Sequence, residues 1–112
     1  LIANTGSEIT KDRLKHYKLL FSKPNHVKGT LKLMAEWNLS EFLNNLKNCK
    51  SSINFLVGNL DKTVPIGISK KWSQILPRTK YHEISGAGHL VHEEKPYEVS
   101  QIILNHLQDT KK

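Results

Sequence analysis

The chain has 112 residues, which is enough for one small domain, and its hydrophobic share of 38% is low for a fold that stands alone. Its net charge is +7, but fifteen of the seventeen basic residues are lysines, and they are spread along the chain. Nucleic-acid binding favours arginines and aromatics clustered on one face, so we expect no nucleic-acid partner. No apolar run reaches the roughly 20 residues of a membrane span, and residues 1–7 lack the features of a signal peptide.

The densest group of basic residues lies in the first third of the chain. At helical spacing these residues indicate a solvated face, and the alternative is a patch that binds an anionic partner. The group consists of Lys11, Arg13, Lys15, Lys18, Lys28 and Lys32.

Cys49 is the only cysteine, so no intrachain disulfide can form, which indicates a reducing compartment such as the cytoplasm. We interpret Cys49 as a loop cysteine rather than a reactive thiol.

Residues 1–47 are predicted to be helical. The expected helices span residues 11–21, 26–37 and 40–46. Their expected N-caps are Thr10, Asn25 and Ser40. A polar stretch at residues 47–52 separates them from the second part of the chain.

Residues 48–112 are predicted to alternate strands and helices. The expected elements are a strand at 53–58, a helix at 66–76, a strand at 80–84, and a helix from Pro96 to Gln108 whose apolar face is Val99, Ile102, Ile103 and Leu107. This order predicts an α/β fold with a parallel sheet. Because two parallel strands do not stand alone, and because the apolar share is low for a freestanding fold, we expect a piece of a larger fold or a chain that needs a partner.

Two loops that follow the predicted strands carry the candidate catalytic residues. In open α/β sheets, catalytic groups gather at the carboxyl ends of the strands. Asp61 follows the first strand and either accepts a histidine N–H or only closes an Asx-turn. His89 follows the second strand, after Gly86 and Gly88, which permit the positive φ of a sharp turn. A histidine so placed is either a general base, because imidazole titrates near neutral pH, or a helix cap.

The combined pattern is an apolar strand, Gly-x-x-Asp-x-x-Val-Pro, helix, strand, Gly-x-Gly-His, helix. It resembles the C-terminal third of the α/β-hydrolase superfamily, where the acid and the histidine of a triad follow successive strands. The resemblance covers about residues 40–107 and implies that Asp61 is the acid and His89 the base, with 27 residues between them. It also implies that residues 1–47 are the end of a helical cap and the return to the hydrolase core.

A narrower resemblance points to the hydrolase-like accessory proteins associated with magnesium chelatase in bacteriochlorophyll synthesis. It is carried by His-Val-Lys-Gly-Thr at 26–30, Met-Ala-Glu-Trp-Asn-Leu at 34–39 and Gly-His-Leu-Val-His-Glu-Glu at 88–94. This resemblance implies an accessory role in handling tetrapyrroles.

The nucleophile of a triad has no match in these residues. The superfamily places it in Gly-x-Ser-x-Gly on a strand-to-helix turn. Residues 67–71 lack the second glycine and lie inside a predicted helix, so the chain alone is expected to be inactive.

No cofactor or metal is expected, because the spacing of His89, His92 and Glu93 matches no zinc motif. Glu93 or Glu94 is expected to cap the last helix.

Four apolar residues are candidates for the lining of a substrate pocket: Met34, Trp37, Val64 and Leu90. An apolar helical stripe is usually buried, so Met34 and Trp37 are interpreted first as packing residues.

Three functions therefore stay open. The first is a hydrolase that acts on a small apolar or amphipathic substrate and whose nucleophile lies upstream in the complete protein. The expected partner of this chain is the missing N-terminal part of the fold or a self-associating copy. The second is a non-catalytic accessory or binding protein on the same fold, for example one that handles tetrapyrroles. The third is a small basic module that binds anionic partners, and a steep salt dependence would favour it.

Overall fold

The computed structural model describes residues 2–109, which form two compact units. The helical unit is residues 9–49, and the core unit joins residues 2–8 to residues 50–109. The sequence-based division at residue 47 did not include this return of the first eight residues to the core unit.

The helical unit consists of α1 (Lys11–Phe21), α2 (Pro24–Ala35) and α3 (Leu39–Lys47). Thr10 caps α1 as predicted, because its hydroxyl accepts a bond from the backbone N–H of Arg13 at 3.4 Å. No residue of the three helices is buried within the described part of the chain.

The two other predicted caps in the helical unit are wrong. Pro24 takes the first turn of α2, where its fixed φ suits a helix and its missing N–H costs nothing, so Asn25 lies inside the helix. In α3 the cap is Asn38, whose side chain accepts from the N–H of Glu41 at 3.2 Å, and Ser40 lies inside the helix. Because α2 ends at Ala35, Trp37 belongs to the connection between α2 and α3.

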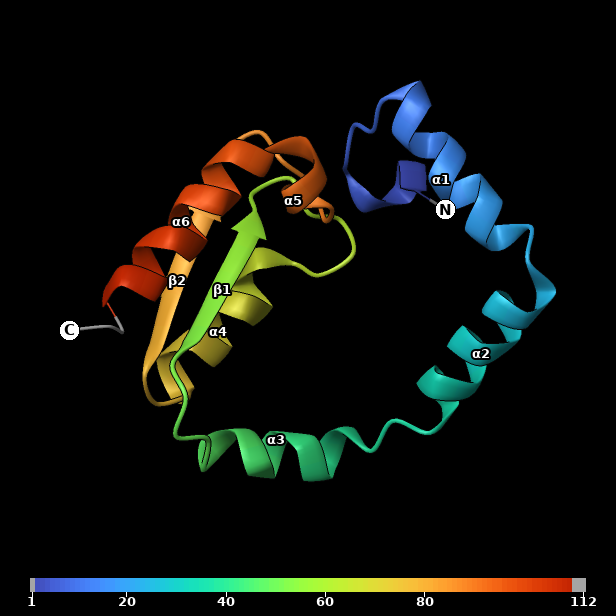
Figure 1. The fold of residues 1–112 in the computed structure, drawn as a ribbon. Coiled ribbons are helices and arrows are strands. Elements are labelled where there is room, and N and C mark those ends of the chain that lie inside the picture. Colours follow the sequence, from blue (N-terminus) through green and yellow to red (C-terminus); the bar gives the residue numbers. More distant parts are fainter. Residues whose placement is uncertain (1, 110–112) are drawn as a thin grey trace. The chain divides into compact units, whose positions relative to one another are not determined.

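The core unit is built on two parallel strands, β1 (Ile53–Gly58) and β2 (Thr79–Ile84), which lie side by side in Figure 1. Ile53 pairs with Thr79 and Gly58 with Ile84. The predicted parallel pairing is therefore confirmed, and β2 begins one residue earlier than expected. The carboxyl ends of both strands meet at one edge, which brings the two loops that follow them together.

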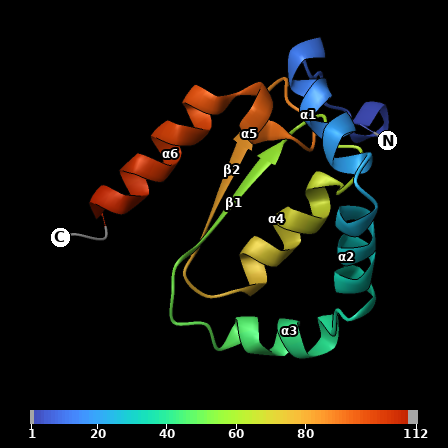
Figure 2. The same cartoon turned by 45° about the vertical axis from the view of Figure 1, so that its right-hand side comes forward.

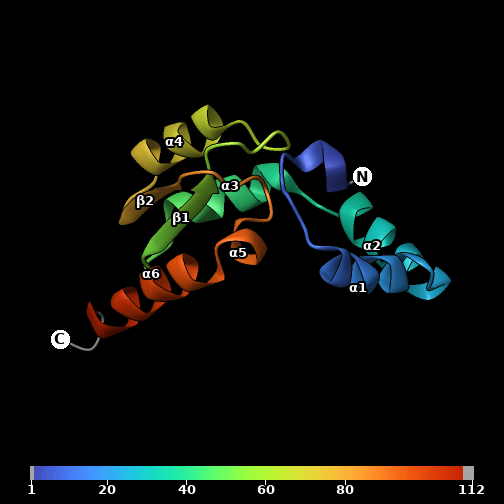
Figure 3. The ribbon, with the colours of Figure 1, turned by 90° about the horizontal axis from the view of Figure 1, so that it is seen from above.

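Helices cover both faces of these strands. Helix α4 (Ile66–Ile75) lies on one face, and α6 (Pro96–Asp109) lies on the other, as Figures 2 and 3 show from different directions. The short helix α5 (Val91–Glu94) precedes α6, and a 3₁₀ turn, η1 (Ile2–Thr5), opens the described chain. Sequence periodicity predicted neither of these four-residue elements.

A small apolar cluster joins the sheet to α5 and α6. Its buried members are Ile84, Ala87, Val91 and Val99, with Leu56 and Ile102 packed against them. The predicted apolar face of α6 is thus half right, because Ile103 and Leu107 are 49% and 51% exposed. The side of α6 that meets this narrow sheet is smaller than the apolar stripe in its sequence.

No helix of residues 2–109 is long and apolar enough to cross a membrane.

Candidate functional site

Asp61 and His89 meet where the two strands end. The Nδ1 atom of His89 lies 2.9 Å from Oδ2 of Asp61. The other carboxylate oxygen, Oδ1, accepts backbone N–H bonds from Thr63 at 2.7 Å and Val64 at 2.9 Å. The Asx-turn and the contact with histidine are therefore not alternatives, since each uses a different oxygen of the same side chain.

The electrostatics of the pair fix which atom carries the proton. Partial burial raises the pKa of Asp61, but the bonds from Val64, the His89 ring and Thr63, with the charge attraction of His89, outweigh it and hold that pKa below its ordinary value. An ionised carboxylate only accepts hydrogen bonds, so at neutral pH Nδ1 of His89 is the donor. In the neutral ring the lone pair is then on Nε2, on a side chain that is 39% exposed, whereas Asp61 is only 7% exposed.

The loops that carry the pair are joined by their backbones. The N–H of Asn59 donates to the carbonyl of Ile84 at 3.1 Å, and the N–H of Leu60 donates to that of Ala87 at 2.8 Å. The side chain of Asn59 accepts from the N–H of Gly86 at 2.8 Å. These bonds continue the parallel pairing beyond the strands and set the spacing between the two functional side chains.

Glycines permit this close approach. A Cβ atom on Gly58 would overlap the carbonyl oxygens of Ala87 and Gly88. Gly86 has a φ of +67°, as the sharp turn predicted. Gly88 does not have a positive φ, and its role differs from the expected one: a Cβ there would overlap the backbone of Gly6 and Ser7.

A segment from the start of the chain, residues 5–8, packs against both loops. The carbonyl oxygen of Thr5 accepts from the N–H of Lys62 and from the N–H of His89, each at 3.2 Å. One backbone oxygen thus connects the residue after the acid to the histidine itself. The hydroxyl of Ser7 accepts from the N–H of Leu90 at 2.8 Å. The sequence analysis missed this segment, and the only local signal for it is Gly6, which has a φ of +76°.

Glu94 does not cap α6 as was expected. Its carboxylate accepts from the N–H of Gly88 at 2.9 Å and from the N–H of Glu8 at 2.9 Å. The glutamate therefore bonds to the turn before His89 and to the N-terminal segment at once.

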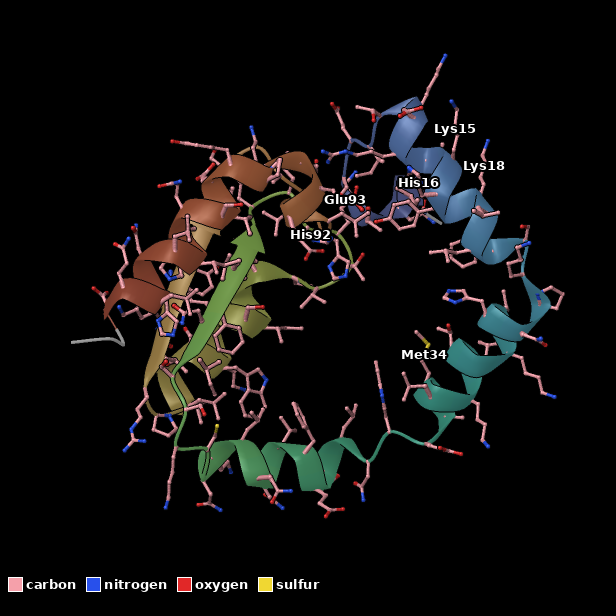
Figure 4. The ribbon with its side chains drawn as sticks, viewed as in Figure 1. Lys15, His16, Lys18, Met34, His92 and Glu93 are labelled. Carbon is pink, nitrogen blue, oxygen red and sulfur yellow. The ribbon has the colours of Figure 1, made fainter. Side chains whose placement is uncertain are left out.

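The four candidate pocket residues fall in different units. Val64 and Leu90 lie in the core unit beside the pair, half-buried, and their backbone N–H groups bond to Asp61 and Ser7. Met34 and Trp37 belong to the helical unit and are 53% and 58% exposed, so the interpretation as buried packing residues is not confirmed. Figure 4 shows Met34 on α2. Trp37 lines an apolar groove of about 510 Å³ together with Glu36, Asn38, Leu39 and Phe42.

The remaining histidines have other surroundings. His92 lies exposed on α5 (Figure 4), while ring nitrogens of His82 and His106 lie 3.1 Å from Asn54 and 3.0 Å from Ser52. Among residues 2–109, no group of three or more His, Cys, Asp or Glu side chains is placed to hold a metal ion.

The fold and the site define a mixed α/β protein with a carboxylate–histidine pair at the carboxyl edge of a parallel sheet. No family model matches the sequence. The chain is similar to the magnesium-chelatase 30 kDa subunit of Rhodobacter capsulatus, with 33% identity over 108 residues. The match covers 96% of this chain and 38% of the relative, so the chain spans well under half of the protein that it matches. The link to magnesium chelatase expected from the sequence is supported, and the α/β-hydrolase fold stays a prediction.

Proposed function

We propose that the natural protein that contains this chain is an accessory protein of magnesium chelatase and handles the tetrapyrrole on which that enzyme acts. The observation that supports this proposal is the similarity to the magnesium-chelatase 30 kDa subunit, which extends over 96% of this chain and so includes both units. A short shared motif around His89 alone would not produce a match of this extent.

Two features of the helical unit suit such a ligand. Trp37, Leu39 and Phe42 offer an apolar groove with aromatic side chains, against which a flat macrocycle can stack. Lysines on the same unit can attract the carboxylates that tetrapyrroles carry. Lys15 and Lys18 extend from α1 with exposed side chains (Figure 4).

The test is a magnesium-insertion assay with purified magnesium chelatase, a carboxylated porphyrin and Mg²⁺. Adding the natural protein should raise the yield or rate of the magnesium porphyrin, and porphyrin should quench the fluorescence of Trp37. A Trp37→Ala variant should weaken the quenching, whereas Trp72→Ala, which changes α4 of the core unit, serves as the matched control. If the natural protein neither binds porphyrin nor alters magnesium insertion, the proposal is wrong.

A second candidate function, triad hydrolysis, is favoured by the geometry of the Asp61–His89 pair. The pair holds Nδ1 of His89 as a donor and leaves Nε2 for the proton of a nucleophile, as a Ser-His-Asp triad requires. The nucleophile would come from the part of the natural protein that corresponds to the rest of the relative's length.

Asp61→Asn separates the two functions. The side-chain amide would turn a donor toward Nδ1 of His89 and place the ring proton on Nε2, so triad hydrolysis of a p-nitrophenyl ester should fall by about 10⁴-fold in kcat. Asp12→Asn, on the exposed side of α1, is the matched control and should change nothing. An accessory function without triad chemistry predicts no ester hydrolysis above background in the wild type or in Asp61→Asn. It also predicts that the two proteins affect magnesium insertion equally.

A further inference from the structure

Glu94 accepts two backbone hydrogen bonds beside the pair, one with each carboxylate oxygen. Its two oxygens bond to segments of the core unit that are far apart in the sequence, because Oε1 accepts from the N–H of Glu8 and Oε2 from the N–H of Gly88, each at 2.9 Å. The side chain is half-buried, and both partners are backbone groups that cannot move without moving their segments.

The charge state of Glu94 suits this task. Partial burial raises its pKa, but bonds from Glu8, from the Ser7 hydroxyl and from Gly88, with the nearby charge of Lys95, hold the pKa below its ordinary value. The carboxylate is therefore ionised at neutral pH and acts only as an acceptor. Bonds from N–H groups to a charged acceptor are stronger than those between neutral groups.

The geometry points to Glu94 as a positioning residue that fixes the ring of His89 against Asp61 by tying the Gly88 turn to residues 5–8. This inference goes beyond the proposed accessory function and concerns the Asp61–His89 pair, on which the second candidate function depends. Gly88 directly precedes His89. In residues 5–8, the carbonyl of Thr5 accepts from the N–H of His89, and the hydroxyl of Ser7 accepts from the N–H of Leu90. Without Glu94, the histidine turn would keep only the bonds of His89 to Thr5 and of Leu90 to Ser7 as connections to residues 5–8.

The experiment measures the His89 ring directly, in the natural protein labelled with ¹⁵N histidine. At pH 7 the wild type should show a hydrogen-bonded Nδ1–H resonance for His89, identified by its loss in His89→Ala. In Glu94→Ala this resonance should broaden or vanish, and the amide of Gly88 should exchange with solvent at least about 10-fold faster. Glu94→Gln should act in the same direction, because its NH₂ group faces a backbone donor.

Two further variants make the result decisive. Glu98→Gln, an exposed glutamate in the first turn of α6, is the matched control and should leave the ring resonance unchanged. Ser7→Ala is a milder change to the same connection and keeps the test valid if Glu94→Ala does not fold; it should weaken the ring resonance in the same direction. A Glu94→Ala protein that is folded and keeps the wild-type ring resonance overturns the inference. Because the readout needs neither porphyrin nor turnover, failure of the proposed function would leave this result interpretable.

Discussion

Asp61 divides its carboxylate between two tasks: one oxygen closes its own loop, and the other orients His89. Glu94 divides its carboxylate in the same way, between Glu8 and Gly88. Both side chains are acceptors of backbone N–H bonds, so their protonation weakens the loops as well as the pair.

The stability of the core unit should therefore depend on acid pH. The pKa values of Asp61 and Glu94 are lower in the fold than their ordinary values of about 4, so their stabilising contribution is complete above that value and is lost as pH falls through the folded pKa values. The melting temperature should be nearly constant from pH 7 to about pH 5 and should then fall as the pH is lowered further. The double variant Asp61→Asn, Glu94→Gln should be less stable at pH 7 and should lose less on acidification. A double variant whose melts run parallel to those of the wild type would contradict this.

At this scale, the sequence placed Asp61 and His89 after successive strands, where the structure brings them together, but it did not indicate the bonds that hold their loops. Each of the two residues follows a strand in a recognisable local pattern, whereas the bonds of Glu94 to Glu8 and of Ser7 to Leu90 join positions more than 80 residues apart. A side-chain contact of that separation leaves no periodic signal in one sequence. A glutamate before α6 was expected to cap that helix because of its negative charge. Glu94 instead accepts from the N–H groups of Gly88 and Glu8.

Strand β1 ends at Gly58, where the two functional loops come closest. The absence of a side chain lets the carbonyl groups of Ala87 and Gly88 lie against the strand. A methyl group here would push the His89 loop away from the Asp61 loop.

Gly58→Ala should destabilise the natural protein by about 1–3 kcal/mol, the usual cost of forcing an extra methyl group into a filled space. The Asp61–His89 bond should lengthen, with loss of the His89 Nδ1–H resonance. Gly67→Ala in α4 is the matched control, since nothing lies within 4 Å of the added Cβ and alanine favours a helix. Equal melting temperatures for the Gly58→Ala and wild-type proteins would show that the loops tolerate separation. Both variants are read out by differential scanning calorimetry.

Element positions followed from periodicity, and element ends depended on chemistry that periodicity does not contain. The boundaries of β1 and α1 were predicted correctly, and those of α4 and β2 to within one residue. The errors fell at caps, where Pro24 and Asn38 took roles assigned to Asn25 and Ser40, and at η1 and α5, which are too short to show a period.

At the scale of the whole molecule, few large apolar side chains among residues 2–109 are buried. The buried hydrophobic residues are Val57, Leu76, Ile84, Ala87, Val91 and Val99. In the core unit, Leu60, Ile68 and Ile75 are about half exposed, and the described sheet has only two strands. Unpaired strand edges beside apolar surface promote association between chains.

The 112-residue chain made alone should self-associate at micromolar concentration, and its apparent mass by light scattering should increase with concentration. A longer protein with the N-terminal part that the relative has is the control and should show a constant mass. A monodisperse monomer of 12.8 kDa with a cooperative melt would contradict this expectation.

The path of the chain through its two units has a consequence for how such proteins diversify. The described chain begins in the core unit, leaves it for residues 9–49, and returns at Lys50. The helical unit is therefore an insert whose two ends are both anchored in the body that carries the pair. Insertions at exposed connections are tolerated better than changes inside a core, so the helical unit can differ between relatives while the carboxylate and the imidazole keep their places.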